Sequence, residues 1–123
     1  MKLISIHQVN TYYFKIYIYT EMSFKFLFHY GFHFLVPFVI AFIFFKKKWI
    51  QVYFIFIGAM LVDLDHLLAT PIFEPNRCSI NFHPLHTYYA IVVYIVMTVL
   101  KKSRILGIAL LFHMLTDYLD CYF

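Results

Sequence analysis

The sequence predicts an all-α fold, a bundle of four transmembrane helices that follows a short N-terminal extension. Hydrophobic residues make up 63% of the 123 residues and charged residues only 13%, whereas soluble proteins average about 25% charged residues. The mean hydropathy is +0.78, which is typical of a membrane protein and excludes a disordered chain. The apolar residues fall into four runs close to the ~20 residues that cross a bilayer as a helix.

Residues 1–21 form the extension and are the least organised part of the sequence. They begin like a signal peptide, but Gln8, Asn10 and Lys15 interrupt the apolar run, and no small-residue cleavage site follows. The tyrosines in this segment suit a membrane interface. We expect a non-helical or interfacial segment, with Met22 as a functional start and residues 22–123 as the four-helix membrane domain.

The first two predicted spans are joined by a short basic turn. The first span covers residues 24–45, and Pro37 is expected to kink it. Lysines at residues 46–48 end this span. The second span covers residues 49–68, and Gly58 is its expected point of close helix packing.

The last two predicted spans follow a polar loop at residues 70–82. The third span begins at Pro84, because proline is tolerated at the first helical position, and ends at Leu100. It is short, so it needs an upright helix or a thin bilayer. A basic cluster at residues 101–104 follows, and the fourth span runs from Ile105 to the C-terminus.

The two basic clusters predict the orientation of the chain. Residues 46–48 and 101–104 are separated by two spans and therefore lie on the same side, which the positive-inside rule makes the cytoplasm. The long loop and the C-terminus then lie outside. The net charge of +4 comes from these short clusters, so it indicates membrane topology and not nucleic-acid binding.

Ionisable residues gather at the outer ends of all four spans. A charge at the bilayer centre costs about 2.5–3.5 kcal/mol, so such residues are rare unless they are paired, hydrated or functional. Asp63 and His66 are expected to share a helix face, with Asp65 pointing elsewhere. Ten of the thirteen histidine and acidic side chains reach one depth in the bilayer: His29, His33, Asp63, Asp65, His66, His83, His86, His113, Asp117 and Asp120. A single residue of this kind would be expected to lie at a helix end near the membrane interface or to fill the core. Ten of them at one depth together predict a metal site.

Imidazoles and carboxylates are ligands of zinc, manganese and iron. A catalytic zinc takes about three protein ligands, so this number of candidates favours two divalent ions, with zinc as the first choice. We expect the metal ligands to be His29, His33, Asp63, His66, His86, His113, Asp117 and Asp120. Asp65 and His83 remain for catalytic roles as base or supporting group. No serine or cysteine stands beside a base in the pattern, so metal-bound water is the expected attacking group.

Four motifs within residues 23–121 carry a resemblance to a known family. They are a histidine in the first span (His33), Asp63-Leu64-Asp65-His66, the pair His83 and His86, and His113-x-x-x-Asp117. This set resembles small bacterial inner-membrane proteins described as metal-dependent hydrolases, the LexA-binding, inner-membrane-associated type. The histidine pair is tighter than the His-Arg-x-x-Thr-His-Ser of better-known members, which makes the chain most similar to a shorter, uncharacterised branch. The resemblance implies a multi-pass metal-dependent hydrolase of the bacterial inner membrane.

The ligand pattern is also similar to that of zinc-dependent phospholipase C and related nucleases. A metal pair about 3.5–4 Å apart would stabilise in-line displacement at a phosphoester, and a site at headgroup level would meet lipid phosphates. We expect a phosphoester or phospholipid substrate, the lipid bilayer as partner, and no nucleic acid. A metal or proton transporter is the second candidate, although the cytoplasmic halves of the spans lack ionisable side chains. The third candidate is a structural subunit whose metal only holds the helices together.

Cys78 and Cys121 both lie on the outer side in this topology. An oxidising compartment permits a disulfide between them, which would hold the long loop over the site and tie down the C-terminus. Two free thiols are the alternative, because single cysteines are common in apolar spans.

Overall fold

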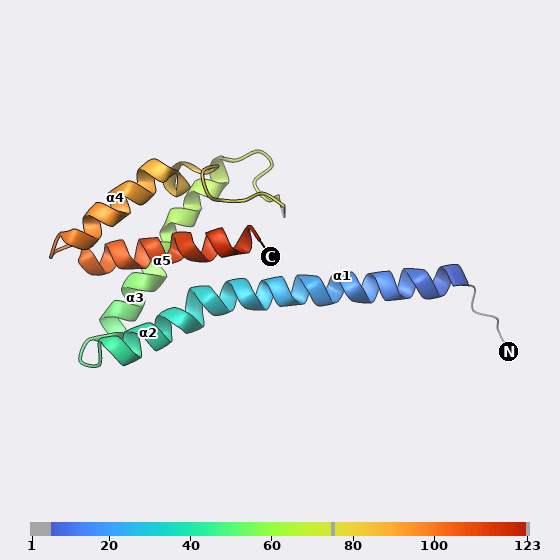
Figure 1. Cartoon of the computed structure of the whole chain (residues 1–123), viewed down its shortest axis with the longest axis horizontal. Helices are drawn as coiled ribbons and strands as arrows, with labels where there is room; N and C mark the ends of the chain where they lie inside the picture. Colours follow the sequence, from blue (N-terminus) through green and yellow to red (C-terminus); the bar gives the residue numbers. More distant parts are fainter. Residues whose placement is uncertain (1–5, 75, 123) are drawn as a thin grey trace.

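The computed structural model describes residues 6–74 and 76–122, and these residues form helices joined by turns and loops, without any strand (Figure 1). The predicted all-α fold class is therefore confirmed for the part of the chain described. Two stretches, Asn10–Phe44 and Trp49–Leu68, are long and apolar enough to cross a membrane by length and composition. Tyr88–Val99 is apolar but shorter.

The first half of the chain forms two rods joined by a basic turn. Helix α1 (Ile6–Tyr30) continues through a π-helical segment, η1 (Gly31–Leu35), into α2 (Val36–Phe44). After the turn, α3 (Trp49–Ala59) continues as a 3₁₀ segment, η2 (Met60–Leu68). Figure 1 shows the first rod extending well beyond the other helices at its N-terminal end.

The expectation of a non-helical extension is wrong for residues 6–21, which form the N-terminal part of α1. No glycine or proline occurs in α1, so nothing in the backbone interrupts the helix at residue 22. The interfacial placement of this segment and its separation as a domain remain predictions.

The kink expected at Pro37 is present as the π-helical segment just before it. Pro37 lacks the N–H that would bond to the carbonyl of His33, four residues earlier. The N–H of Val36 instead bonds to the carbonyl of Gly31, five residues earlier. Figure 1 shows the rod changing direction there. Such π segments widen one turn of a helix, and this one carries His33.

The second half of the chain forms a helical hairpin that packs on α3. A short 3₁₀ segment, η3 (Pro84–His86), precedes α4 (Tyr88–Val99), and a basic turn leads to α5 (Arg104–Asp120). The hydroxyl of Thr87 caps α4 by accepting the N–H of Ala90 at 3.3 Å. In Figure 1, α4 and α5 lie side by side, and α5 crosses α3.

Close packing occurs at Gly107 and not at Gly58, which corrects the sequence prediction. A Cβ added at Gly107 would lie 2.8 Å from the backbone nitrogen of Thr98 and 2.9 Å from Met97. A Cβ at Gly58 would meet nothing within 4 Å. Helix α5 can therefore approach α4 only because residue 107 has no side chain.

Of the two states that the sequence left open for Cys78 and Cys121, the structure has the disulfide, with the two Cα atoms 5.0 Å apart. It joins the loop at residues 69–83 to the end of α5. Free thiols, the alternative, do not occur among the residues described. The loop and the C-terminal end of the bundle are thus held together beside the ionisable residues.

Candidate metal site

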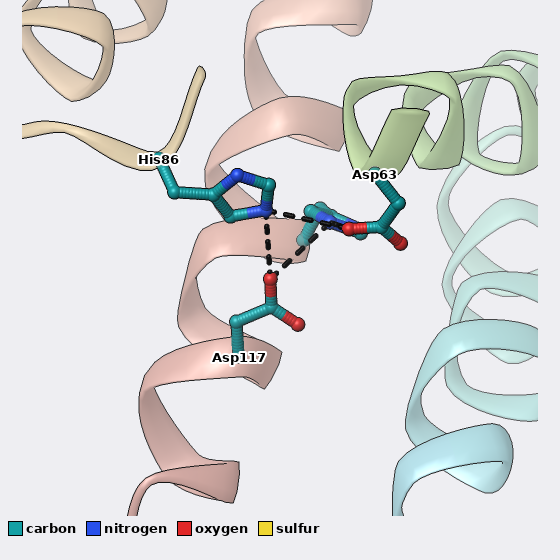
Figure 2. Close-up of side chains that lie close together, drawn as sticks. Asp63, His86 and Asp117 are labelled. Atoms are coloured by element: carbon teal, nitrogen blue, oxygen red, sulfur yellow. Dashed lines mark hydrogen bonds and ion pairs between the residues drawn. The ribbon is translucent and has the colours of Figure 1, made fainter. Parts of the chain in front are cut away.

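Four side chains from three separate segments converge on one point, which we call the central cluster: Asp63, His86, His113 and Asp117. Nε2 of His86 lies 2.9 Å from Oδ2 of Asp117 and 3.4 Å from Oδ1 of Asp63 (Figure 2). Nε2 of His113 lies 3.0 Å from the same Asp63 oxygen and 3.4 Å from the same Asp117 oxygen. Each residue thus turns one ligand atom toward its neighbours.

These separations match the edges of a metal coordination shell. Zinc–nitrogen and zinc–oxygen bonds of about 2.0–2.2 Å place neighbouring ligands about 3.3 Å apart in a tetrahedron. Four nitrogen–oxygen distances within the central cluster range from 2.9 to 3.4 Å. Two imidazoles and two carboxylates are also a donor set that zinc, manganese and iron accept.

The hydrogen bonding of the cluster leaves donor atoms available to a bound cation. Nε2 of His86 and Oδ2 of Asp117 are buried, and neither has an aligned hydrogen bond. Within the part of the chain that the structure describes, Asp63 and Asp117 form ion pairs only with histidines. Asp117 is buried without a Lys or Arg partner, which is costly for a carboxylate. Protonated histidines or a bound divalent cation would balance its charge.

A second group, the outer cluster, consists of His29, His33 and Asp117. Nε2 of His33 lies 3.4 Å from Oδ1 of Asp117, whose other oxygen faces the central cluster. This buried nitrogen likewise has no hydrogen-bond partner. Asp117 therefore presents one oxygen to each cluster, the arrangement by which a carboxylate bridges two metal ions.

Two further carboxylates orient the histidines of these clusters. Oδ2 of Asp65 accepts hydrogen bonds from Nδ1 of His86 at 3.1 Å and from the N–H of Leu85 at 2.7 Å. The proton of His86 is thereby held on Nδ1, and the lone pair of Nε2 faces the central cluster. Asp120 pairs in the same way with Nδ1 of His29. Carboxylates commonly fix metal-bound imidazoles by such contacts.

The local backbone explains why Asp65 points inward, contrary to the sequence prediction. The segment around Asp65 is a 3₁₀ helix, with about three residues per turn in place of 3.6. The following loop folds back over it, because Asn81 adopts a left-handed conformation with φ of 60° and donates its N–H to the carbonyl of His86 at 2.9 Å. Asp65, only 5% exposed, is thus enclosed between His66 and His86.

The expected ligand His66 belongs to a third group with Asp65 and His83, and its Nδ1 lies 3.6 Å from Oδ1 of Asp63 in the central cluster. The rings of His66 and His83 are in contact, with centroids 3.8 Å apart and a tilt of 30° between their planes. The ligand atoms of Asp65, His66 and His83 lie within 4.8 Å of one another, so these three residues form a third set that could hold a metal. Burial, with His66 nearby, lowers the pKa of His83.

The structure also places an unpredicted residue at the site. Oγ of Ser79 lies 3.1 Å from Nε2 of His66. The two residues are thirteen positions apart in sequence and are joined mainly by an irregular loop, so no helical or strand periodicity could have linked them. The ten predicted residues thus lie together, but they divide into the central cluster, the outer cluster with Asp120, and the Asp65, His66 and His83 group.

Comparison with known proteins gives a family but no activity. Residues 22–123 match the model of a family of unknown function. No curated protein and no solved structure matches the chain. The match assigns no substrate and no metal, so the resemblance to inner-membrane hydrolases remains a prediction.

Proposed function

The chain belongs to DUF6122, a family of unknown function, and from its own residues we propose that it is an integral membrane, metal-dependent hydrolase of phosphoesters. The observation that carries the proposal is the geometry of the central cluster. Its four donor atoms are spaced like the ligands of one ion, and Asp117 extends the arrangement to a second position. We propose zinc, with manganese or iron as alternatives.

The burial of the apolar helices supports a membrane location. Only 17% of the apolar window within Asn10–Phe44 and 22% of that within Trp49–Leu68 is buried inside the protein. The core helix of a soluble protein would be mostly buried, whereas lipid would cover these side chains. We propose four spans, formed by the helices up to Phe44, α3 with η2, α4 and α5. The basic turns at residues 46–48 and 101–104 would face the cytoplasm.

The uneven exposure of the site supports a catalytic role over a purely structural one. The side chains of His86, His113 and Asp117 are at most 5% exposed, but that of Asp63 is 35% exposed. In the outer cluster, His29 is also 35% exposed. A substrate can therefore approach along Asp63 and His29, while a structural metal site is usually closed on all sides.

The site is better suited to hydrolysis of a phosphoester than to transport of an ion. Bound as a pair, two metal ions would activate water and stabilise negative charge on phosphoryl oxygens. A transporter needs polar groups through the membrane, yet α2, α3 and α4 contain no charged side chain and no histidine. The one-sided distribution therefore favours hydrolysis at headgroup level.

The test is turnover by protein purified in detergent without chelators. We expect hydrolysis of bis(p-nitrophenyl) phosphate or of phospholipids in mixed micelles, lost with a chelator and restored by zinc or manganese. Asp63→Ala should abolish turnover, whereas Glu74→Gln, which changes an exposed loop carboxylate, should retain it. Turnover that is insensitive to chelator, or absent with every phosphoester in the presence of added metal, would contradict the proposal.

A further inference from the structure

Ser79, His66 and Asp65 form a chain of contacts that the metal clusters do not use. The hydroxyl oxygen of Ser79 lies 3.1 Å from Nε2 of His66. The other ring nitrogen, Nδ1, is hydrogen-bonded to the carbonyl oxygen of Asp63 at 3.1 Å, and Oδ1 of Asp65 also lies 3.1 Å from it without an aligned hydrogen bond. The order serine, imidazole and carboxylate is that of a hydrolytic nucleophile with its base.

The surroundings of His66 assign its proton. Nδ1 faces oxygen atoms that can only accept, the Asp63 carbonyl and the Asp65 carboxylate, so the neutral ring carries its hydrogen on Nδ1. Nε2 therefore has a free lone pair, and the Ser79 hydroxyl donates to it. A base that removes a serine proton needs this tautomer. Ser79 thereby occupies the free nitrogen of His66 and competes with a metal ion for it.

The backbone holds Ser79 firmly in this position. Its carbonyl oxygen accepts the N–H of Phe82 at 3.2 Å and that of His83 at 3.3 Å. The preceding residue, Cys78, is fixed to the end of α5 by the disulfide. Ser79 itself is only half-buried, so a reactant can reach its hydroxyl. Fixed position and access are both required of a nucleophile.

We propose that Ser79 is a catalytic nucleophile that attacks the phosphorus of a phosphoester, with His66 as its base. The Oγ–phosphorus bond forms, the bond to the leaving alcohol breaks, and the Ser79 proton passes through Nε2 of His66 to the leaving oxygen. Water then attacks the phosphoserine and gives its proton to His66. The phosphorus–Oγ bond breaks, and Ser79 regains a proton. The phosphoester substrate class rests on the proposed hydrolase function, whereas the assignment of Ser79 as a nucleophile rests on its contact with His66.

Asp65 links this nucleophile to the metal clusters as a positioning residue. One of its oxygens faces His66, and the other accepts the hydrogen bond of His86. The nucleophile and the central cluster are therefore held by one buried side chain. A phosphoester bound at the exposed edge of Asp63 would lie next to His66, whose Nδ1 is 3.6 Å from Oδ1 of Asp63.

The test is covalent labelling of the full-length protein in detergent with a fluorophosphonate probe, in which phosphorus bonds to Oγ and fluoride leaves. We expect one adduct on the wild-type protein, mapped by mass spectrometry to the reduced tryptic peptide that begins at Cys78. Ser79→Ala should abolish labelling, and His66→Gln should slow it about 100-fold or more. The matched control is Ser103→Ala, because the Ser103 hydroxyl donates to the Met97 carbonyl and has no imidazole partner.

The outcomes separate this inference from the proposed function. A wild-type protein that is not labelled, or labelling that survives in Ser79→Ala, would show that the Ser79–His66 bond is merely structural. Labelling at Ser79 without any phosphoester turnover would uphold the nucleophile and overturn the phosphoester assignment. Turnover that is equal in Ser79→Ala and the wild type would leave the metal hydrolase standing and overturn the nucleophile.

Discussion

At the scale of single residues, two aspartates organise the site by using their two oxygens differently. Asp117 turns Oδ2 to His86 and Oδ1 to His33. Asp65 turns Oδ2 to His86 and Oδ1 to His66. Both oxygens of a carboxylate accept hydrogen bonds, so each aspartate can orient two imidazoles. A neutral amide has one acceptor oxygen and could orient only one of them in this way.

Asp65→Asn tests this account. Every group that faces Asp65 is a donor: the N–H of Leu85, Nδ1 of His86 and Nδ1 of His66. An amide would set its own N–H against one of these donors, so His86 would lose its orientation. We expect the affinity for metal to fall about 10–100-fold, with stoichiometry retained at saturating metal. Metal titration of chelator-stripped protein measures this, with Glu74→Gln as control, and an unchanged dissociation constant would refute the role of Asp65.

At the scale of secondary-structure elements, the hairpin of α4 and α5 depends on Gly107. Its closest neighbours are backbone atoms of Met97 and Thr98, which cannot move aside without shifting α4. Two of the four central-cluster residues, His113 and Asp117, lie on α5, so this contact sets their position relative to η3.

Gly107→Ala should therefore destabilise the protein, by about 1–3 kcal/mol as for other overpacked cores. Gly58→Ala is the matched control, because its Cβ would meet nothing within 4 Å and alanine favours a helix by about 0.5–1 kcal/mol over glycine. The midpoint of denaturant unfolding in detergent distinguishes the two variants. A Gly107→Ala protein as stable as Gly58→Ala would contradict the close approach.

The positions of the helices were predicted from the sequence more accurately than the residues at which the helices contact one another. The four apolar runs at residues 24–45, 49–68, 84–100 and 105–123 each contain a described helix, because apolar runs end where basic or turn residues begin. Gly58 was expected as the packing point and Gly107 was not, because sequence alone does not say where two helices cross. The helicity of residues 6–21 was missed because polar side chains interrupt the apolar pattern without interrupting the backbone.

At the scale of the whole molecule, the ten predicted histidines and aspartates of the site meet at one end of the bundle, where the disulfide connects the long loop to α5. Equal depth in four spans was enough to predict which residues gather. It could not predict how they divide, since the division depends on the 3₁₀ turn at Asp65 and the loop reversal at Asn81. Ser79 was missed for the same reason, because an irregular loop carries it to His66.

The proposed topology predicts which added cysteines a membrane-impermeant maleimide will reach in intact bacteria. Both native cysteines are in the disulfide, so an added cysteine is the only free thiol. Asn76→Cys, in the exposed outer loop, should be labelled directly. Lys47→Cys, in the exposed basic turn, should be labelled only after the membrane is permeabilised. The reverse pattern would invert the topology, and equal labelling of both without permeabilisation would exclude a membrane-spanning hairpin.

The central claim is that the clustered histidines and aspartates bind metal, and metal analysis of purified protein tests it most directly. After purification in detergent without chelators, we expect about two divalent ions per chain in the wild type, as in bridged two-metal sites. His33→Ala should lose the ion of the outer cluster and keep the other, whereas Asp117→Asn, which alters the shared carboxylate, should lose both. A wild-type protein without metal even after incubation with zinc, manganese or iron would contradict the account, as would an Asp117→Asn protein with the wild-type metal content.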